Sequence, residues 1–265
     1  MIAVQDLWAG YGEEPVLRGV DFRAARGEFV GILGPNACGK STFLRVLTGA
    51  LGFDRGQVLV DTLDVARAEP RHLARLHATV PQSTSIPFPF TGFEIVLMGR
   101  YPRMGRFSRE TDADRAAVDT ALSRTDTLDL ANRLVTQVSG GERQRLILAR
   151  ALAQEAPVLL LDEATAAMDV HRKIDAFDLL AELNAEGTTV LAVMHDLNLA
   201  AQYCRRLLFL KNGQVHAEGA TAEVFTRDVL EAVYETPVRV SLHPDTGRPH
   251  AVFLPRKPLD VKGET

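Results

Sequence analysis

The chain has 265 residues, of which 46% are hydrophobic, and a formal net charge of -4. This length allows one large or two small domains with a buried core, and the mildly acidic balance gives no overall attraction to nucleic acid. The longest apolar runs fall far short of the roughly 20 residues that cross a bilayer, and the first residues do not resemble a signal peptide, so we expect a cytosolic protein that reaches a membrane only through a partner.

The first sixty residues predict an antiparallel sheet followed by a strand, a loop and a helix. Up to about residue 30, β-favouring runs alternate with turn signals, which is typical of an antiparallel edge sheet. The apolar run EFVGIL (28–33) indicates a buried strand, and STFLRVLTGAL (41–51) indicates a helix. Between them, GPNACGKST (34–42) matches the phosphate-loop pattern G-x-x-x-x-G-K-[ST] in the context that the motif requires.

In such a loop, backbone N–H groups converge on phosphate oxygens at a helix N-terminus. Lys40 would reach the β and γ phosphates, and Ser41 would give its hydroxyl to Mg²⁺. The alternative is that this stretch is a tight turn that matches the motif by chance. The strand before it and the helix after it make that alternative less favoured. The residues predicted to bind nucleotide here are Gly34, Asn36, Ala37, Cys38, Gly39, Lys40, Ser41 and Thr42.

The middle of the chain interrupts an alternating β and α pattern with a helical segment. Residues 56–65 predict a strand pair, and residues 71–80 predict a helix and a short strand that lead to Gln82. From about 83 to 153 helical periodicity dominates, so we expect an inserted helical subdomain. The apolar strands in PVLLLDEA (157–164) and GTTVLAVMHD (187–196) then restore the βαβ pattern of a parallel sheet and an α/β fold.

The end of the chain predicts a hairpin and a short extension. Residues 207–210 and 214–217 flank the turn KNG, which is typical of a hairpin. Beyond it, RDVLEAVYE (227–235) indicates a helix, and a strand pair is expected around HPDTGRPH (243–250). We therefore expect a main domain over 1–220 and a C-terminal extension over 221–265. Cys38 and Cys204, the two cysteines, are expected to be reduced, because pairing them would lock the phosphate loop.

Two acids close a predicted buried strand in VLLLDE (158–163). Asp162 would lie at the carboxyl edge of the sheet, where it can orient the Mg²⁺ shell, and Glu163 would lie beside the γ phosphate as a candidate general base. The alternative is a solvated pair of acids at a strand end. A further stretch, VSGGERQR (138–145), opens a helix, and Ser139 could act there only as an N-cap.

Taken in order, the phosphate loop, Gln82, the Ser-Gly-Gly stretch, the strand ending in two acids and His195 form a specific series. The chain resembles the nucleotide-binding subunit of ATP-binding cassette (ABC) transporters over residues 1–220. The resemblance implies a RecA-like P-loop core with an antiparallel β subdomain and an inserted helical subdomain. It also implies a homodimer that binds ATP and Mg²⁺ and hydrolyses ATP when the two subunits close.

The same resemblance assigns roles to single residues. Tyr11 matches the aromatic residue that stacks on adenine; Trp8 is the less favoured candidate, and either could be only an edge-strand aromatic. Gln82 matches a residue that contacts Mg²⁺ and the attacking water, and His195 matches the switch histidine at the γ phosphate. The residues that would reach the ATP of the opposite subunit are Ser139, Gly140, Gly141 and Asp169.

Three longer stretches, 88–107, 194–220 and 229–255, resemble the ATPase subunits of importers for metal chelates. A ferric siderophore is the favoured cargo, with haem or cobalamin as alternatives. The segment LMGRYP (97–102) lies where the family docks a permease helix, although it could simply pack inside the helical subdomain. Implied partners are two permease subunits at the cytoplasmic face of the membrane and, indirectly, a substrate-binding protein. The less favoured alternatives are an ABC ATPase acting on nucleic acid and a P-loop kinase or metabolic ATPase that works alone.

Three residues depart from the family pattern. Ala37 stands where glycine is usual and would strain the loop by on the order of 1 kcal/mol if the position needs a positive φ. Ala164 replaces a proline after the two acids. Cys38, near a helix N-terminus, is expected to have a lowered thiol pKa, so that a thiol reagent would inhibit the ATPase and ATP would protect it.

Overall fold

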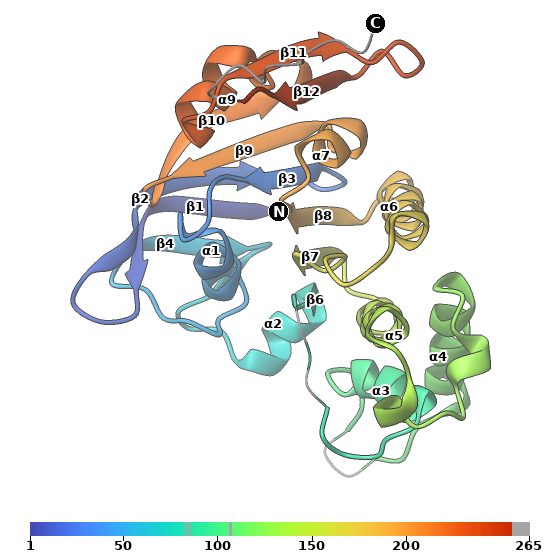
Figure 1. The fold of residues 1–265 in the computed structure, drawn as a ribbon. Helices are drawn as coiled ribbons and strands as arrows, with labels where there is room; N and C mark the ends of the chain where they lie inside the picture. Colours follow the sequence, from blue (N-terminus) through green and yellow to red (C-terminus); the bar gives the residue numbers. More distant parts are fainter. Residues whose placement is uncertain (83, 85, 106–107, 256–265) are drawn as a thin grey trace, which may run out of the picture.

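The computed structural model describes residues 1–82, 84, 86–105 and 108–255, and in this part of the chain the strands form three sheets with helices around them (Figure 1). The first sheet is antiparallel, as predicted, and has the strand order β2-β1-β4-β5. Its strands alternate buried and more exposed side chains, so that one face lies on the core. They span β1 (Ile2–Gly10), β2 (Pro15–Ala24), β4 (Arg55–Val60) and β5 (Leu63–Asp64).

The second sheet has the order β10-β9-β3-β8-β7-β6. Its neighbours from β9 to β6 are parallel, and β10 joins the edge by the antiparallel hairpin that the sequence predicts. Every residue of β3 and β8 is buried, as expected for central parallel strands covered on both faces. The strands are β3 (Phe29–Leu33), β6 (His77–Val80), β7 (Val158–Asp162), β8 (Thr189–Val193), β9 (Arg206–Lys211) and β10 (Gln214–Ala220).

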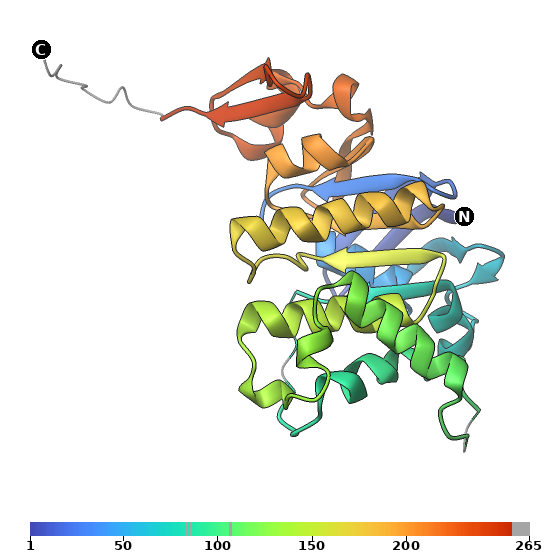
Figure 2. The same cartoon turned by 90° about the vertical axis from the view of Figure 1, so that its right-hand side faces the viewer.

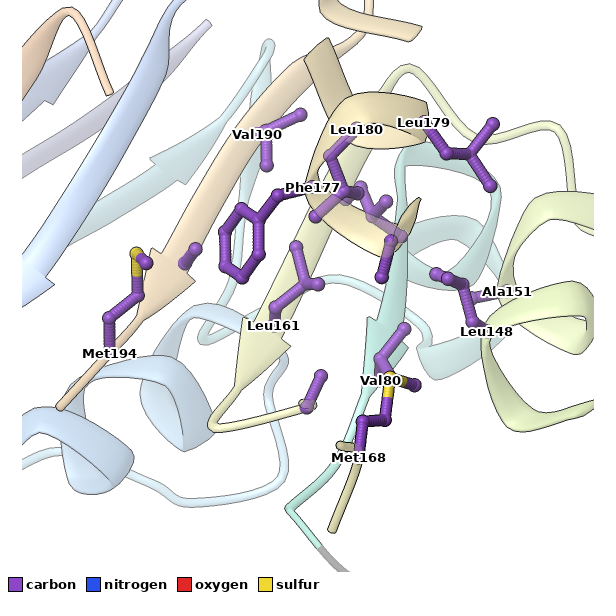
Figure 3. Close-up of a cluster of buried hydrophobic side chains, with 14 of the residues drawn as sticks. Val80, Leu148, Ala151, Leu161, Met168, Phe177, Leu179, Leu180, Val190 and Met194 are labelled. Atoms are coloured by element: carbon purple, nitrogen blue, oxygen red, sulfur yellow. The ribbon is translucent and has the colours of Figure 1, made fainter. Parts of the chain in front are cut away.

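Helices cover both faces of this sheet. On one face, α1 packs between the parallel sheet and the antiparallel sheet, and its Phe43 meets the ring of Phe22 edge to face. On the other face, Phe177 of α6 points toward Leu161 and Val190, with α5 beyond (Figure 3). The helices are α1 (Lys40–Leu47), α2 (Pro70–Leu76), α3 (Gly92–Leu97), α4 (Asp112–Arg124), α5 (Gly140–Ala153), α6 (Val170–Ala185), α7 (Leu197–Tyr203), α8 (Thr221–Val224) and α9 (Arg227–Tyr234).

The segment between β6 and β7 is helical in its described residues, apart from loops and one isolated bridge between Thr91 and Leu134. The periodicity over 109–134 resolves into α4, which stops at Arg124, and a short 3₁₀ turn over Leu128–Leu130. Arg100 holds these helices together: its guanidinium donates to Asp114 on α4 and to the carbonyl of Ala153 at the end of α5. Ser83, where this segment was expected to begin, lies outside the described residues.

The C-terminal extension forms α8, α9 and a small antiparallel sheet of β11 (Val238–Leu242) and β12 (Pro249–Phe253). The helix and the strand pair predicted there are thus present. It lies at the β9 and β10 edge of the molecule, away from α3 and α4 (Figures 1 and 2). Among the described residues, no helix combines the length and the apolar character needed to cross a bilayer.

Candidate nucleotide-binding site

The predicted phosphate loop lies between the end of β3 and the start of α1, and it wraps around its own lysine. The side chain of Lys40 is buried, and its ammonium group donates to the carbonyls of Gly34 (2.8 Å) and Pro35 (2.9 Å). Gly34 has φ 146°, and a Cβ there would lie 2.1 Å from the carbonyl oxygen of Leu210, so only glycine fits. The loop therefore presents its backbone around one fixed positive charge.

The strain expected at Ala37 is present, because this residue adopts the left-handed conformation with φ 60°. A Cβ in this region costs on the order of 1 kcal/mol relative to glycine. The loop keeps its conformation despite that cost, since the flanking β3 and α1 are anchored in the core.

The lowered pKa expected for the Cys38 thiol is wrong. Its thiol is buried and lies two residues before the first residue of α1, and burial raises the thiol pKa more than the nearby Lys40 ammonium lowers it. The two cysteines, Cys38 and Cys204, are both free, as predicted. The neutral thiol is therefore the stable form of Cys38, which is the opposite of a reactive thiolate.

The residues predicted to hold Mg²⁺ meet across the loop. The hydroxyl of Ser41, on α1, donates to the carboxylate of Asp162 at the end of β7 (2.8 Å). Burial raises the pKa of Asp162, and the Ser41 hydroxyl acts in the opposite direction. A hydroxyl and a carboxylate in contact are a donor set that suits a hard cation such as Mg²⁺. Both residues line a cleft of about 450 Å³, together with Gln82.

Glu163 is held between the other two predicted catalytic residues. One carboxylate oxygen accepts from the amide of Gln82 (2.6 Å), and the other lies 2.6 Å from Nε2 of His195. These residues follow β6, β7 and β8, which are neighbours in the sheet and run parallel. The carboxyl ends of parallel strands share one edge, so three side chains far apart in sequence converge there. Glu163 itself has φ 51°, an unusual conformation that is often found at functional sites.

Ser139 caps α5, which was the structural alternative for this residue. Its hydroxyl accepts from the N–H of Glu142 (3.2 Å), and the Glu142 carboxylate accepts from the N–H of Ser139 (2.7 Å). The glycines that follow have no packing reason within the chain: a Cβ on Gly140 would meet nothing within 4 Å, and one on Gly141 only a carbonyl at 3.7 Å. Asp169 likewise caps α6, accepting from the N–H of Arg172.

The two candidate aromatic residues differ in their surroundings. Tyr11 is exposed on the turn after β1, and its hydroxyl accepts from Arg45 (2.9 Å). The indole of Trp8 donates instead to Asp6 (2.8 Å). Arg45 was not identified from the sequence, although it stands four residues after Ser41 on α1 and therefore faces the same cleft. Its position makes it a further candidate for contact with nucleotide.

Comparison with known proteins identifies the family. The sequence model of the family described as 'ABC transporter' matches residues 17–166, which is more than half of the chain. This protein belongs to the ABC transporter family. The chain is 46% identical to a cobalamin import ATP-binding protein of Halobacterium salinarum, over 86% of this chain and 57% of that one. It therefore spans little more than half the length of that relative.

Two other relatives are matched over most of their length. The chain is 43% identical to a hemin import ATP-binding protein of Streptomyces coelicolor, over 89% of this chain and 84% of the relative. It is 37% identical to the ferric enterobactin transport ATP-binding protein of Escherichia coli, over 95% of this chain and 93% of the relative. All three relatives are named as ATP-binding proteins for import or transport, with different cargoes.

Solved structures agree with the fold. A transporter described as being of the metal-chelate type, in an inward-facing conformation, has a TM-score of 0.84 at 28% identity, over 96% of this chain and 97% of that one. The dimeric cassette MJ0796, bound to ADP and phosphate, has a TM-score of 0.75 at 30% identity, over 83% of this chain and 99% of that one. The predicted fold class is thus confirmed: the chain has the α/β fold of an ABC cassette with an antiparallel β subdomain and a helical segment.

Proposed function

We propose that this protein is the ATP-hydrolysing subunit of an ABC importer for a metal chelate, with a ferric siderophore as the favoured cargo. The observation that carries the ATPase proposal is the position of Glu163, held by Gln82 and His195 beside the Ser41 and Asp162 pair. A carboxylate next to a phosphate loop and a cation pair is the arrangement that hydrolysis of a nucleoside triphosphate needs.

The phosphate loop would bind ATP through its backbone N–H groups and Lys40. Lys40 would exchange its bonds to the carbonyls of Gly34 and Pro35 for the β and γ phosphates. Ser41, Asp162 and Gln82 would hold Mg²⁺, which neutralises phosphate charge and orients the γ phosphate. Tyr11 would lie against the adenine, where its exposed ring is available for stacking.

Glu163 would act as the general base. Its carboxylate takes a proton from the attacking water, and the amide of Gln82 and the imidazole of His195 keep that carboxylate facing the γ phosphate. His195 would also contact the γ phosphate when ATP is bound. A hydrogen bond from Gln82 and a close ion-pair contact with His195 restrict the rotamers of this carboxylate, so the base is oriented before substrate arrives.

The site would be completed by a second copy of the chain. Ser139, Gly140, Gly141 and Asp169 would reach the ATP of the opposite subunit. The support is that a Cβ on Gly140 would meet nothing within 4 Å among the described residues, which leaves room for a ligand to approach the helix N-terminus. The dimeric cassette structure bound to ADP and phosphate shows that a similar chain assembles as a pair.

A groove on the helical segment is the proposed permease site. Its lining includes Phe90, Phe93, Glu94, Leu97, Met98 and the exposed Tyr101. Residues 97–102 also contribute to packing inside the helical segment, because Gly99 and Arg100 are buried there. The permease would place the protein at the cytoplasmic face of the membrane and link it to a substrate-binding protein. Haem and cobalamin remain the alternative cargoes, in keeping with the names of the relatives.

Glu163→Gln tests the ATPase proposal directly. This variant should bind ATP, form a stable ATP-bound dimer and lose nearly all turnover, since the amide accepts no proton from water. Asp119→Asn, on the exposed face of α4, removes a carboxylate outside the site and should hydrolyse ATP like the wild type. Wild-type turnover in Glu163→Gln would refute its role as base.

The cargo requires a separate assay. The chain, its permease and its binding protein would be reconstituted in vesicles, and ATP hydrolysis measured with a ferric siderophore, haem or cobalamin. Stimulation by the siderophore supports the proposal, and stimulation by haem or cobalamin alone favours the alternatives.

A further inference from the structure

Helix α5 holds both ends of strand β6 through two glutamine side chains. Near the start of the helix, the amide of Gln144 donates to the carbonyl of Pro81, the residue that follows β6 (2.9 Å). At the end of the helix, the amide of Gln154 donates to the carbonyl of His77, the first residue of β6 (2.7 Å), and also to that of Ala74. Both contacts run from a side chain to the backbone, so they fix the strand itself.

The spacing of the two glutamines matches the length of the strand. Ten residues of a helix rise about 15 Å, and the four residues from one acceptor carbonyl to the other extend about 13 Å along a strand. Between the two contacts, Leu148 of α5 and Val80 of β6 belong to one buried cluster (Figure 3). Helix and strand are therefore fixed to one another along the whole of β6.

The contact of Gln144 lies where the sheet stops holding the chain. β6 is an edge strand, and its pairing with β7 ends at the residue before Pro81. Proline has no N–H, so the carbonyl of Pro81 is the one backbone group through which a hydrogen bond can hold this residue. Gln144 supplies that bond, and the next residue is Gln82, whose amide donates to Glu163 (2.6 Å).

The contact also joins the interior to the wall of the candidate site. Gln144 is only 5% exposed, whereas Pro81 lines the cleft of about 450 Å³ that contains Ser41 and Asp162. Removing one partner of a buried hydrogen bond costs more than removing an exposed one, because water does not replace the lost group. The backbone immediately before Gln82 therefore depends on a buried side chain that lies outside the cleft.

We propose that Gln144 is a positioning residue for the nucleotide site, which holds the carbonyl of Pro81 and thereby keeps Gln82 in contact with Glu163 and in place for Mg²⁺. This inference rests on the proposed ATPase function and deepens it. Gln144 itself does not touch nucleotide. Gln154 holds the far end of the same strand and serves folding alone.

Two matched variants of the full-length chain test this difference. Gln144→Met removes the amide donor and keeps the length of the side chain. Gln154→Met makes the same change at the other end of β6, about 13 Å along the strand from Pro81. Each variant loses a contact between α5 and β6, so each should unfold at a lower temperature than the wild type. Gln144→Leu also lacks the amide and replaces Gln144→Met if that variant does not fold.

Turnover is measured by phosphate release at saturating ATP and Mg²⁺. Loss of one net hydrogen bond corresponds to roughly three- to tenfold, so Gln144→Met should lower kcat by about that factor. Affinity for a fluorescent, non-hydrolysable ATP analogue is measured with Mg²⁺ and with EDTA. Gln144→Met should reduce the gain in affinity that Mg²⁺ brings and leave the affinity in EDTA unchanged. Gln154→Met should match the wild type in kcat and in both affinities.

A double-mutant cycle identifies the residue through which Gln144 acts. Gln82→Ala removes the side chain that Gln144 is proposed to position. In this background, Gln144→Met should cause no further reduction of the gain in affinity that Mg²⁺ brings. The binding measurement gives this answer without any turnover.

The outcomes distinguish the inference from the function on which it rests. Wild-type kcat in Gln144→Met overturns the inference, and so does an equal loss of kcat in Gln154→Met, because that result indicates general destabilisation. A reduction of the Mg²⁺-dependent gain by Gln144→Met that is as large with Gln82→Ala as without it also overturns the inference. Absence of ATP hydrolysis in the wild-type chain and its permease complex would refute the proposed function instead.

Discussion

A buried histidine should make the stability of this protein depend on pH. His77, the first residue of β6, has an imidazole that is 6% exposed, and neither ring nitrogen has a hydrogen-bond partner among the described residues. Burial lowers the pKa of His77 from 6.5 to about 4. The neutral imidazole is thus the form that the folded chain accepts, because no acceptor compensates a buried imidazolium.

The sign and size follow from proton linkage. Below pH 6.5 the unfolded chain binds a proton at this position that the folded chain does not, so the free energy of unfolding falls as the pH falls toward 4. The loss amounts to about 2 kcal/mol at pH 5 and approaches about 3 kcal/mol near pH 4. Above pH 6.5 the residue contributes no pH dependence.

Urea unfolding at pH 7.5 and pH 5, followed by circular dichroism, measures this effect. His77→Leu and His77→Phe stay uncharged at both values, so the stability difference between the two pH values should shrink by about 2 kcal/mol. His72→Gln, on the exposed surface of the neighbouring α2, should keep the wild-type difference. If the His77 variants keep the full wild-type pH dependence, the lowered pKa of His77 is refuted.

Three other changes have defined outcomes. Ala37→Gly removes strain of about 1 to 2 kcal/mol at φ 60° but adds freedom to the unfolded chain, so stability should rise by about 0.5 kcal/mol and ATP should bind somewhat more tightly; lower stability contradicts this. In a Cys204→Ser background, Cys38 should react slowly with a thiol reagent at pH 8 and faster in urea. Rapid reaction of Cys38 in the folded protein would instead support the hypothesis of a reactive thiolate. Arg100→Met leaves the buried Asp114 carboxylate without its guanidinium and should cost about 3 to 5 kcal/mol in urea unfolding; wild-type stability contradicts this.

The sequence by itself determined the elements that depend on neighbours in the chain. The buried strand before GPNACGKST, the helix after it and the hairpin around KNG are all present, because apolar periodicity and turn residues act over a few positions. It also indicated the positive φ at Ala37, since the motif usually has glycine there. Glu163, Gln82 and His195 could be named because each stands in a recognisable motif.

Only the tertiary structure decided how distant segments meet. The contact of Glu163 with Gln82 and His195 depends on the sheet order that places β7 between β6 and β8, which no local pattern reveals. Local reasoning went wrong at Cys38, where a helix N-terminus suggested a lowered pKa. Burial of the thiol in the folded chain outweighs that local effect, because desolvation depends on every segment packed around the group. For the same reason, the contact of Asn198 on α7 with Ala251 on β12 became visible only in the fold.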